Sequence, residues 1–353
     1  MKSYFVYIFL IALVIIHYLS ARPIYKDGDK VRITSVVISD PIVYDKSQYI
    51  KLAGLKLYLP LLPEIYYGDR IVVEGTVIDD TLKNPKLIKK EETVSFSSSI
   101  RKRIINFYKE SLPDPYPGLI AGITLGSKGT LNTDFFEKVK KVGVAHVVVA
   151  SGTNITFVTS FLVNFLSLFL IRRKMIPLVV LGIILYLFIS GFEAPLIRAS
   201  VMATIVFIAQ EKGRLASTWR ILTLTALLML LFKPQWIVDL GFILSFVSTA
   251  SLILFERKIR ERLKFVPQVF KESLSTSVAA QIGVAPILFV TFGDFNIWSP
   301  IVNMLVLWTI PLIMIVGSLG GVVGIFIPLL GKLILYLGYP VLLWFNYIVN
   351  LFS

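Results

Sequence analysis

Long apolar runs dominate this chain and decide what it can fold into. One run covers residues 4–19, and others follow in series from residue 144 to the C-terminus. Because the hydrocarbon core of a bilayer is about 30 Å thick, a helix that crosses it needs about 20 mainly apolar residues. We expect about nine spans, which we place at residues 4–19, 144–170, 176–191, 195–210, 219–232, 236–255, 274–292, 300–327 and 333–352. The sequence therefore predicts an α-helical polytopic membrane protein.

The first apolar run follows Lys2 and ends at the small residues Ser20 and Ala21. Small residues there are typical of a cleaved signal peptide, but the run is long for one. We therefore expect an uncleaved transmembrane anchor over residues 1–22. Either interpretation exports the segment that follows.

Residues 23–96 have a different character, with short alternating segments such as "KVRITSVVI" and "DRIVVEGTVI" separated by Asp, Pro and Gly. This spacing is typical of a small all-β unit. A turn at Gly68-Asp69 and a kink at Gly75 suit a five-stranded OB-like barrel. We predict an OB-like domain over 23–96.

Two further regions complete the predicted domain organisation. Residues 97–142 contain helical patterns too short to span and are expected to form amphipathic or interfacial helices. Residues 143–353 are expected to form the transmembrane domain. Within it, Pro311 and several glycines leave open whether 300–327 is one helix or two.

The charges of the loops predict how the chain is oriented. If the N-terminus is cytoplasmic, the loops at 171–175, 211–220 and 256–272 face the cytoplasm and hold twelve Lys and Arg residues. The opposite loops hold only Lys233. This asymmetry follows the positive-inside rule. We expect a multi-pass protein of the cytoplasmic (inner) membrane with an extracytoplasmic β unit.

Much of the formal charge of +14 is therefore an orientation signal. Residues 101–141, on the predicted outer side, nevertheless hold eight Lys and Arg residues against four Asp and Glu residues. The rule does not explain this excess, which is available for an anionic partner. Its candidate contact residues are Arg101, Lys102, Arg103 and Lys128.

The stretch "VGVAHVVVASGTNITFV" opens an apolar run with polar groups, among them His146, Ser151 and Asn154. After Gly152, polar side chains recur three or four residues apart and share one helical face. They are Thr153, Thr156, Ser160, Asn164 and Ser167. Such a face belongs against other helices or against water, so it serves either as interhelical contact or as the lining of a conduit.

Arg198 lies in the predicted outer third of a span. An arginine inside a membrane is costly unless it pairs, faces water or reaches the headgroups, so a functional role is the first expectation. Glu193 and Asp239 are the candidate partners. Gln281 and Asn303 are isolated amides in apolar surroundings, and each requires a buried partner or water.

Composition excludes several chemistries. The chain has no cysteine and only two histidines, so it cannot form disulfides or a histidine-rich metal centre. His146 and Ser151 would point about 140° apart on a helix, and no G-x-S-x-G motif surrounds the serine. We therefore predict no catalytic residue, no metal site and no cofactor. A membrane hydrolase remains the weakest alternative.

Four motifs, in order, resemble the core of the ComEC competence family. They are "GVAHVVVASGTNITFV", "SGFEAPLIRASVMA", "WIVDLGFILSFVSTASL" and "AAQIGVAPILFVTFGDFNIWSPIVNML". An OB-like unit before the core is also similar to that family. The resemblance implies a channel that imports single-stranded DNA across the membrane during natural transformation.

The resemblance also implies where the DNA path lies. Its motif positions fall on His146, Ser151, Gly152, Asn154, Arg198, Gln281, Pro286 and Asn303, and we add Thr156 from the polar face. Many members of the family continue into a metallo-β-lactamase-like domain, whose His-rich motif does not appear here. The second histidine of the family's first motif is Asn154 in this chain.

The implied partners are single-stranded DNA, membrane lipids, a DNA receptor outside the cell, an ATPase motor inside it and a separate nuclease. No nucleotide-binding P-loop occurs in the sequence, so a motor is another protein. A transporter or channel for another anionic solute or polymer is the alternative function.

Overall fold

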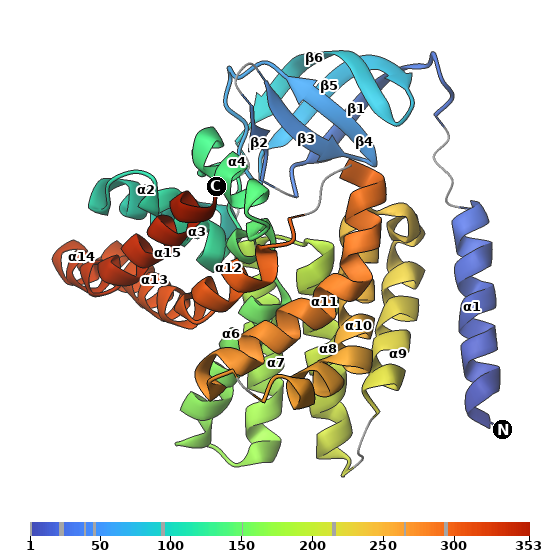
Figure 1. The fold of residues 1–353 in the computed structure, drawn as a ribbon. Coiled ribbons are helices and arrows are strands. Elements are labelled where there is room, and N and C mark those ends of the chain that lie inside the picture. The colour runs from blue at the N-terminus through green and yellow to red at the C-terminus, as the bar shows by residue number, and fades with distance from the viewer. Residues whose placement is uncertain are drawn as a thin grey trace.

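In the computed structural model, the described residues are 2–20, 25–38, 40–44, 47–92, 96–149, 151–213, 217–264, 266–292 and 296–353. The predicted end of the anchor at residue 22, the "TVS" before Phe96 and parts of three predicted loops lie outside them. The described chain is mostly helical, with one small sheet near the N-terminus (Figure 1).

The chain begins with the apolar helix α1 (Lys2–Ser20) and continues into six strands. The strands are β1 (Lys30–Val36), β2 (Ile42–Val43), β3 (Gln48–Leu52), β4 (Leu55–Leu59), β5 (Arg70–Ile78) and β6 (Thr81–Glu91). Along the strands, alternate residues are buried, as in β4, because successive side chains point to opposite faces. The inward set forms a separate apolar core that includes Ile50, Leu57 and Ile71.

The sheet order is β1-β5-β6-β4-β3-β2, and β4 and β6 are its only parallel pair among the described residues. The described hydrogen bonds do not join the edge strands β1 and β2, so the sheet stays open. The expected closed five-stranded barrel is therefore not confirmed. Gly75 does coincide with a register irregularity between β5 and β6, where a Cβ would meet the Leu82 side chain at 2.6 Å.

Eight helices, which we call the scaffold group, share one apolar core that includes Tyr108, Leu119 and Phe345. They are α2 (Phe96–Ser111), α3 (Tyr116–Leu125), α4 (Thr133–Lys141), α5 (Ala145–Val148), α12 (Ser299–Val306), α13 (Thr309–Phe326), α14 (Pro328–Leu337) and α15 (Tyr339–Phe352). Every residue of α3 is buried. The short helices predicted within residues 97–142 are confirmed as α2, α3 and α4.

The remaining helices form a second group, which we call the bundle, and lie below the sheet in Figure 1. They are α6 (Gly152–Ser167), α7 (Arg172–Ser190), α8 (Ala194–Glu211), α9 (Thr218–Phe232), α10 (Leu240–Arg262) and α11 (Gln268–Phe292), with the 3₁₀ turn η1 (Pro234–Val238) before α10. Their apolar contacts form two smaller clusters, one of which Val14 of α1 joins.

By length and composition, five helical stretches among the described residues can cross a membrane: α7, α8, α10, Phe270–Thr291 of α11, and α13. The pair α14 and α15 adds a sixth if it forms one span, although it bends by 47°. The chain is thus a polytopic helical membrane protein, but the expected number of nine spans is not confirmed.

Local sequence explains why some predicted spans are divided. The segment 300–327 is two helices, α12 and α13, that break at Leu307 and Trp308. Pro311 has no N–H to donate to the Leu307 carbonyl, which weakens the helix there. The segment 144–170 holds the short α5 and the 16-residue α6, and α9 has only 15 residues.

Polar contacts hold the sheet against the helices. Lys51 of β3 forms an ion pair of 2.7 Å with Asp239, which precedes α10. The Tyr67 hydroxyl donates to the Phe188 carbonyl of α7 at 3.1 Å. The end of α6 and the start of α7 lie at the end of the bundle away from the sheet, as do the end of α8 and the start of α9 (Figure 1). The described residues of the predicted basic loops, 171–175, 211–213 and 217–220, therefore lie opposite the β unit.

Candidate functional site in the helical bundle

Asn154, which the motif comparison singled out, lies in a buried hydrogen-bond network. Its Nδ2 donates to the Ile123 carbonyl of α3 at 2.7 Å and lies 3.2 Å from the Tyr186 hydroxyl. Tyr186 in turn donates to the Thr124 carbonyl at 2.9 Å. The last carbonyls of a helix lack partners within it, so these side chains satisfy buried acceptors. Asn154 therefore joins α6 and α7 to α3 and does not line an open path.

Arg101 completes the same network from α2. Its Nη1 donates to the Leu125 carbonyl at 2.7 Å and to the Ile189 carbonyl at 2.5 Å. Its Nη2 pairs with Asp40 at 2.6 Å. The side chain is only 3% exposed, so the expected place of Arg101 on the outer basic surface is wrong. Sequence spacing placed Arg101 on the polar side of a helix. The guanidinium nevertheless points inward, because the carbonyls at the ends of α3 and α7 and the Asp40 carboxylate accept its hydrogen bonds there.

The other predicted surface cations are distributed differently. Lys102 and Arg103 are exposed on α2, and the Lys102 ammonium lies 4.9 Å from the centre of the Tyr66 ring. Lys128 is half-buried and pairs with Glu193 at 2.7 Å. The four cations therefore do not form one basic patch.

His146 and Ser151 do not form a catalytic pair with each other in the described hydrogen bonds. The imidazole is exposed on the short helix α5. Ser151 precedes α6, and its hydroxyl donates to the Asn154 Oδ1 at 3.2 Å. The serine thus supports the buried network of Asn154.

Gly152 brings the start of α6 against α8. A Cβ at this position would lie 3.0 Å from the Arg198 Nη2 and 3.3 Å from the Ala199 Cβ. A side chain at residue 152 would therefore move the guanidinium. The first free N–H groups of a helix carry partial positive charge, so Arg198 and the start of α6 together form a region that favours an anion.

Arg198 has no acidic partner in the part of the chain that the structure describes. Both predicted partners are engaged elsewhere, Glu193 with Lys128 and Asp239 with Lys51, so that expectation is wrong. The Arg198 Nη1 hydrogen-bonds the Thr249 hydroxyl of α10, while its buried Nε has no hydrogen-bond partner. The bundle therefore holds an unneutralised guanidinium between α6, α8 and α10.

Asp239 directly precedes α10. Its carboxylate also accepts from the Phe242 N–H at 3.2 Å and so caps the helix. Burial raises the pKa of Asp239, but the hydrogen bond and charge of Lys51 and the backbone N–H groups of Phe242 and Gly241 outweigh it and lower the pKa below its ordinary value. Asp239 thus stays ionised, but Lys51 offsets its charge.

The predicted polar face of α6 is uncovered. Five members of the stripe after Gly152 are exposed, whereas Asn154 and Ile155, which lie outside that stripe, are buried. The exposed members are Thr153, Thr156, Ser160, Asn164 and Ser167. Next to this face lies an aromatic face, where Phe161 and Phe165 stack with ring centres 6.0 Å apart.

Several buried hydroxyls of the bundle have no hydrogen-bond partner in the described part of the chain. Among them are Thr159 of α6, Ser200 of α8, Thr225 of α9 and Ser245 of α10. Buried polar groups are normally paired, because an unpaired one costs about 1–3 kcal/mol. Ser245 lies one helical turn from Thr249, so it extends the polar region around Arg198.

Gln281 and Asn303 lie apart from this region. Gln281 is half-buried on α11. Asn303 is buried on α12, where its Nδ2 is 3.4 Å from the Ser299 hydroxyl and its Oδ1 has no partner among the described residues.

Sequence reasoning missed two residues of the site, Tyr186 and Thr249. An isolated tyrosine in an apolar span was a signal for the first, and the spacing of Thr249 from Ser245 was a signal for the second.

The fold and site thus define a polytopic membrane protein with an unpaired arginine in its helical bundle. The sequence model of the family "Competence protein" matches residues 123–353, and the chain belongs to this family. It is 30% identical over 230 residues to ComE operon protein 3 of Bacillus subtilis (strain 168), a match that covers 64% of this chain and 28% of that protein.

The chain is also 25% identical over 245 residues to the uncharacterized protein YcaI of Escherichia coli (strain K12), which covers 66% of this chain and 31% of YcaI. It thus matches less than a third of the length of either relative. No solved structure matches the chain.

Proposed function

We propose that this chain forms a membrane conduit that passes single-stranded DNA into the cell during natural transformation. Family membership supports a role in DNA uptake for competence. The conduit itself is inferred from the chemistry of the bundle.

Arg198 is the observation that carries this proposal. It belongs to α8, a candidate span, and no described carboxylate neutralises it. A charged group in an apolar environment is costly unless an anion or water reaches it. A guanidinium presents a rigid fork of donors that suits phosphate oxygens. A phosphate of a passing strand would therefore find both charge and a free donor at Arg198.

The exposed polar face of α6 offers a route that leads to Arg198. The Thr156 and Ser167 hydroxyls donate to carbonyls of α6 at 3.3 and 2.8 Å. No described hydrogen bond engages the side chains of Thr153, Ser160 and Asn164, which cannot face lipid without cost because lipid supplies no hydrogen bonds. Water along this face would satisfy them and would admit a hydrated strand. We assign Thr156 and Gly152 to this path, and Asn154 and Ser151 to its support.

The β unit supplies a surface for bases at the start of this route. Tyr49 and Tyr58, on β3 and β4, lie with ring centres 5.2 Å apart, and Lys51 and Lys56 are exposed on the same strands. Aromatic rings and lysines together bind single strands by stacking and by charge. Lys51 also contacts Asp239, so this surface lies beside the start of α10.

We also propose that the β unit is OB-like and extracytoplasmic. β1 and β2 are consecutive in the chain yet stand at opposite edges of one sheet. The chain between them therefore connects the two edges, as a partly open barrel requires. The basic turns at the far end of the bundle support a cytoplasmic location for that end.

We propose no covalent chemistry for this chain. The Ser151 hydroxyl is engaged by Asn154, and a nucleophile requires a base within hydrogen-bond reach. We further propose that an ATPase motor, a DNA receptor and a nuclease act together with this chain.

Transformation of a deletion strain tests the proposal. Complementation with this chain should restore uptake, and Arg198→Ala should lower transformation roughly 100-fold, because an unpaired phosphate in the bundle costs several kcal/mol. Arg198→Lys should recover part of the loss. Arg172→Ala is the matched control, since Arg172 is exposed and bonds Gln210 at 2.8 Å.

Normal transformation by Arg198→Ala at equal membrane levels would contradict the proposal. DNA bound at the cell surface should be unchanged in all variants. Normal transformation by the deletion strain itself would contradict the proposal as well. The second measurement is salt-dependent binding of single strands to the purified chain. Its absence would favour another anionic solute or polymer.

A further inference from the structure

Lys332 is the single charged residue between positions 299 and 353. It lies on α14, one member of the bent apolar pair. The side chain is exposed, and its ammonium lies 5.9 Å from the centre of the Tyr336 ring. No carboxylate forms an ion pair with it in the described chain. A lone cation in a long apolar segment calls for an anion from outside the protein.

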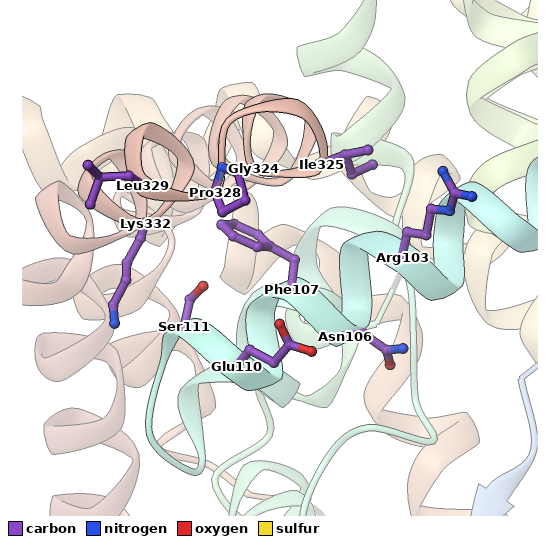
Figure 2. Close-up of a pocket in the computed structure, with 10 residues that line it drawn as sticks. All are labelled: Arg103, Asn106, Phe107, Glu110, Ser111, Gly324, Ile325, Pro328, Leu329 and Lys332. Carbon is purple, nitrogen blue, oxygen red and sulfur yellow. The ribbon is translucent and has the colours of Figure 1, made fainter.

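A pocket of about 620 Å³ adjoins Lys332, between α2 and the turn that joins α13 to α14 (Figure 2). Gly324, Pro328 and Leu329 form its apolar wall. A Cβ on Gly324 would lie 2.2 Å from the Phe107 ring, so glycine there lets the ring pack tightly against α13. The pocket is therefore a gap beside a well-packed contact between α2 and α13.

The α2 side of the pocket is polar. Asn106, Glu110 and Ser111 line it, and Arg103 stands at the end opposite Lys332 (Figure 2). No described hydrogen bond or ion pair engages the side chains of Arg103 or Glu110. The pocket thus combines two free cations, a free carboxylate and hydroxyl and amide groups around an apolar wall.

The surface next to the pocket is apolar and exposed, which suits contact with acyl chains. Leu329, Leu333 and Leu337 follow one face of α14 and are 74%, 58% and 78% exposed. In a membrane protein such a face contacts lipid tails. A ligand at this place therefore has an apolar part that lies on α14 and a polar part that enters the pocket.

We propose that this pocket binds the headgroup of an anionic glycerophospholipid of the phosphatidylglycerol type. The phosphate pairs with Lys332 and reaches the Ser111 hydroxyl, which lies at the same end of the pocket (Figure 2). The glycerol hydroxyls of the headgroup donate to Glu110 and Asn106. The acyl chains cover Leu329 and Leu333. Basic residues that border a membrane helix recognise anionic lipids in this way.

Equilibrium binding of fluorescent phosphatidylglycerol to the detergent-solubilised chain tests the site, with fluorescent phosphatidylcholine as reference. The unaltered chain should prefer phosphatidylglycerol. Lys332→Leu should weaken that binding about fivefold, which is the contribution of one basic residue near a membrane surface. Lys109→Leu is the matched control, because Lys109 is exposed on α2 outside the pocket.

Two further variants separate binding from folding. Lys332→Arg should keep the preference. Arg103→Ala should weaken it less than Lys332→Leu, with an unchanged melting temperature, because Arg103 adds positive charge to the pocket from the end opposite the phosphate. Equal binding of both lipids by the unaltered chain, or an unchanged preference in Lys332→Leu, would overturn the proposal.

Competitors identify the ligand class. Inorganic phosphate and glycerol 3-phosphate should displace the lipid poorly, because they lack acyl chains. Displacement by either at concentrations comparable with the lipid would identify a free phosphate site and overturn the lipid assignment. Displacement by a single-stranded oligonucleotide that depends on Lys332 would do the same in favour of nucleic acid.

Discussion

The scaffold group and the bundle are both apolar, yet they bury their residues very differently. In α13 of the scaffold group, 44% of the spanning window is buried, whereas the value is 11% in both α8 and α10 of the bundle. The two groups also differ in how many buried polar atoms lack a hydrogen-bond partner. Among the described residues, the scaffold group has one, the Asn303 Oδ1, whereas the bundle has several, including the Arg198 Nε and the Ser245 hydroxyl.

Both groups contain candidate membrane spans, but the scaffold group packs tightly and pairs most of its buried polar atoms, whereas the bundle leaves several unpaired among the described residues. The scaffold group closes on itself through glycines that admit neighbouring helices, as at Gly324, and through side chains that satisfy the end of α3, such as Arg101. The bundle leaves polar groups open. The helices α8 and α10 are less apolar than α13, but all three are apolar enough to cross a membrane. What separates the two groups is whether each polar atom has a partner within the chain.

Of the substitutions proposed, Arg101→Met should destabilise the scaffold group most. This change leaves Asp40 and two carbonyls without their buried donor, and we expect a loss of about 3–5 kcal/mol in the free energy of unfolding. Thermal melting of the solubilised chain measures it. Lys102→Met, at the exposed neighbouring position, should have little effect. Equal melting temperatures for the two variants would show that the Arg101 network does not hold the scaffold group together.

A pair of glycine substitutions sharpens the comparison. At Gly122, an added Cβ would lie 2.5 Å from the Val148 carbonyl oxygen, which belongs to the backbone. Gly122→Ala should therefore cost about 1–3 kcal/mol in stability. At Gly152 the nearest atom is the Arg198 Nη2, the end of a flexible side chain. Gly152→Ala should melt almost normally but lower transformation, because it displaces the guanidinium.

The comparison of the scaffold group with the bundle requires that Gly122→Ala and Gly152→Ala differ in melting temperature. A Gly152→Ala chain that melts as low as Gly122→Ala would place residue 152 in the structural core. A Gly152→Ala chain that transforms normally would remove Gly152 from the DNA path.

The smallest effect is expected from acid at the contact between the sheet and α10. The pKa of Asp239 is lowered in the folded chain, so its contribution is present above the ordinary carboxyl pKa and is lost as pH falls through the folded value. Because Lys51 is partly exposed, we expect less than about 1 kcal/mol. Proteolysis of the β unit at falling pH measures its release. Asp239→Asn should abolish that pH dependence, and an equal pH dependence in this variant would exclude Asp239 as its source.

Sequence patterns predicted the short helices of the scaffold group well, because their apolar spacing and their Pro and Gly boundaries are local signals. They could not predict that Arg101 turns inward. That choice depends on the carbonyl ends of α3 and α7, which meet α2 only in the folded chain. The pairing of Asp239 with Lys51, 188 positions apart, is likewise a product of tertiary structure.

The candidate site was predicted in part. The polar face of α6 and the isolated Arg198 are readable from spacing and hydropathy alone. The burial of Asn154 was not, although it lies two residues from the exposed Thr156, because burial depends on which helix covers each face. The sequence left open whether 300–327 is one helix or two, and the structure has two, with the break at Leu307 and Trp308. The predicted span at 333–352 is interrupted at Gly338, which composition alone did not indicate.

The central claim is that water reaches the polar face of α6, and single cysteines test it directly because the chain has none of its own. We compare Thr156→Cys and Ser160→Cys with Phe161→Cys, which lies on the aromatic face of the same helix. A membrane-impermeant thiol reagent requires water and the thiolate. It should modify the first two roughly tenfold faster, and single-stranded DNA should slow only these two. Equal modification of all three, or faster modification at residue 161, would contradict a hydrated path along α6.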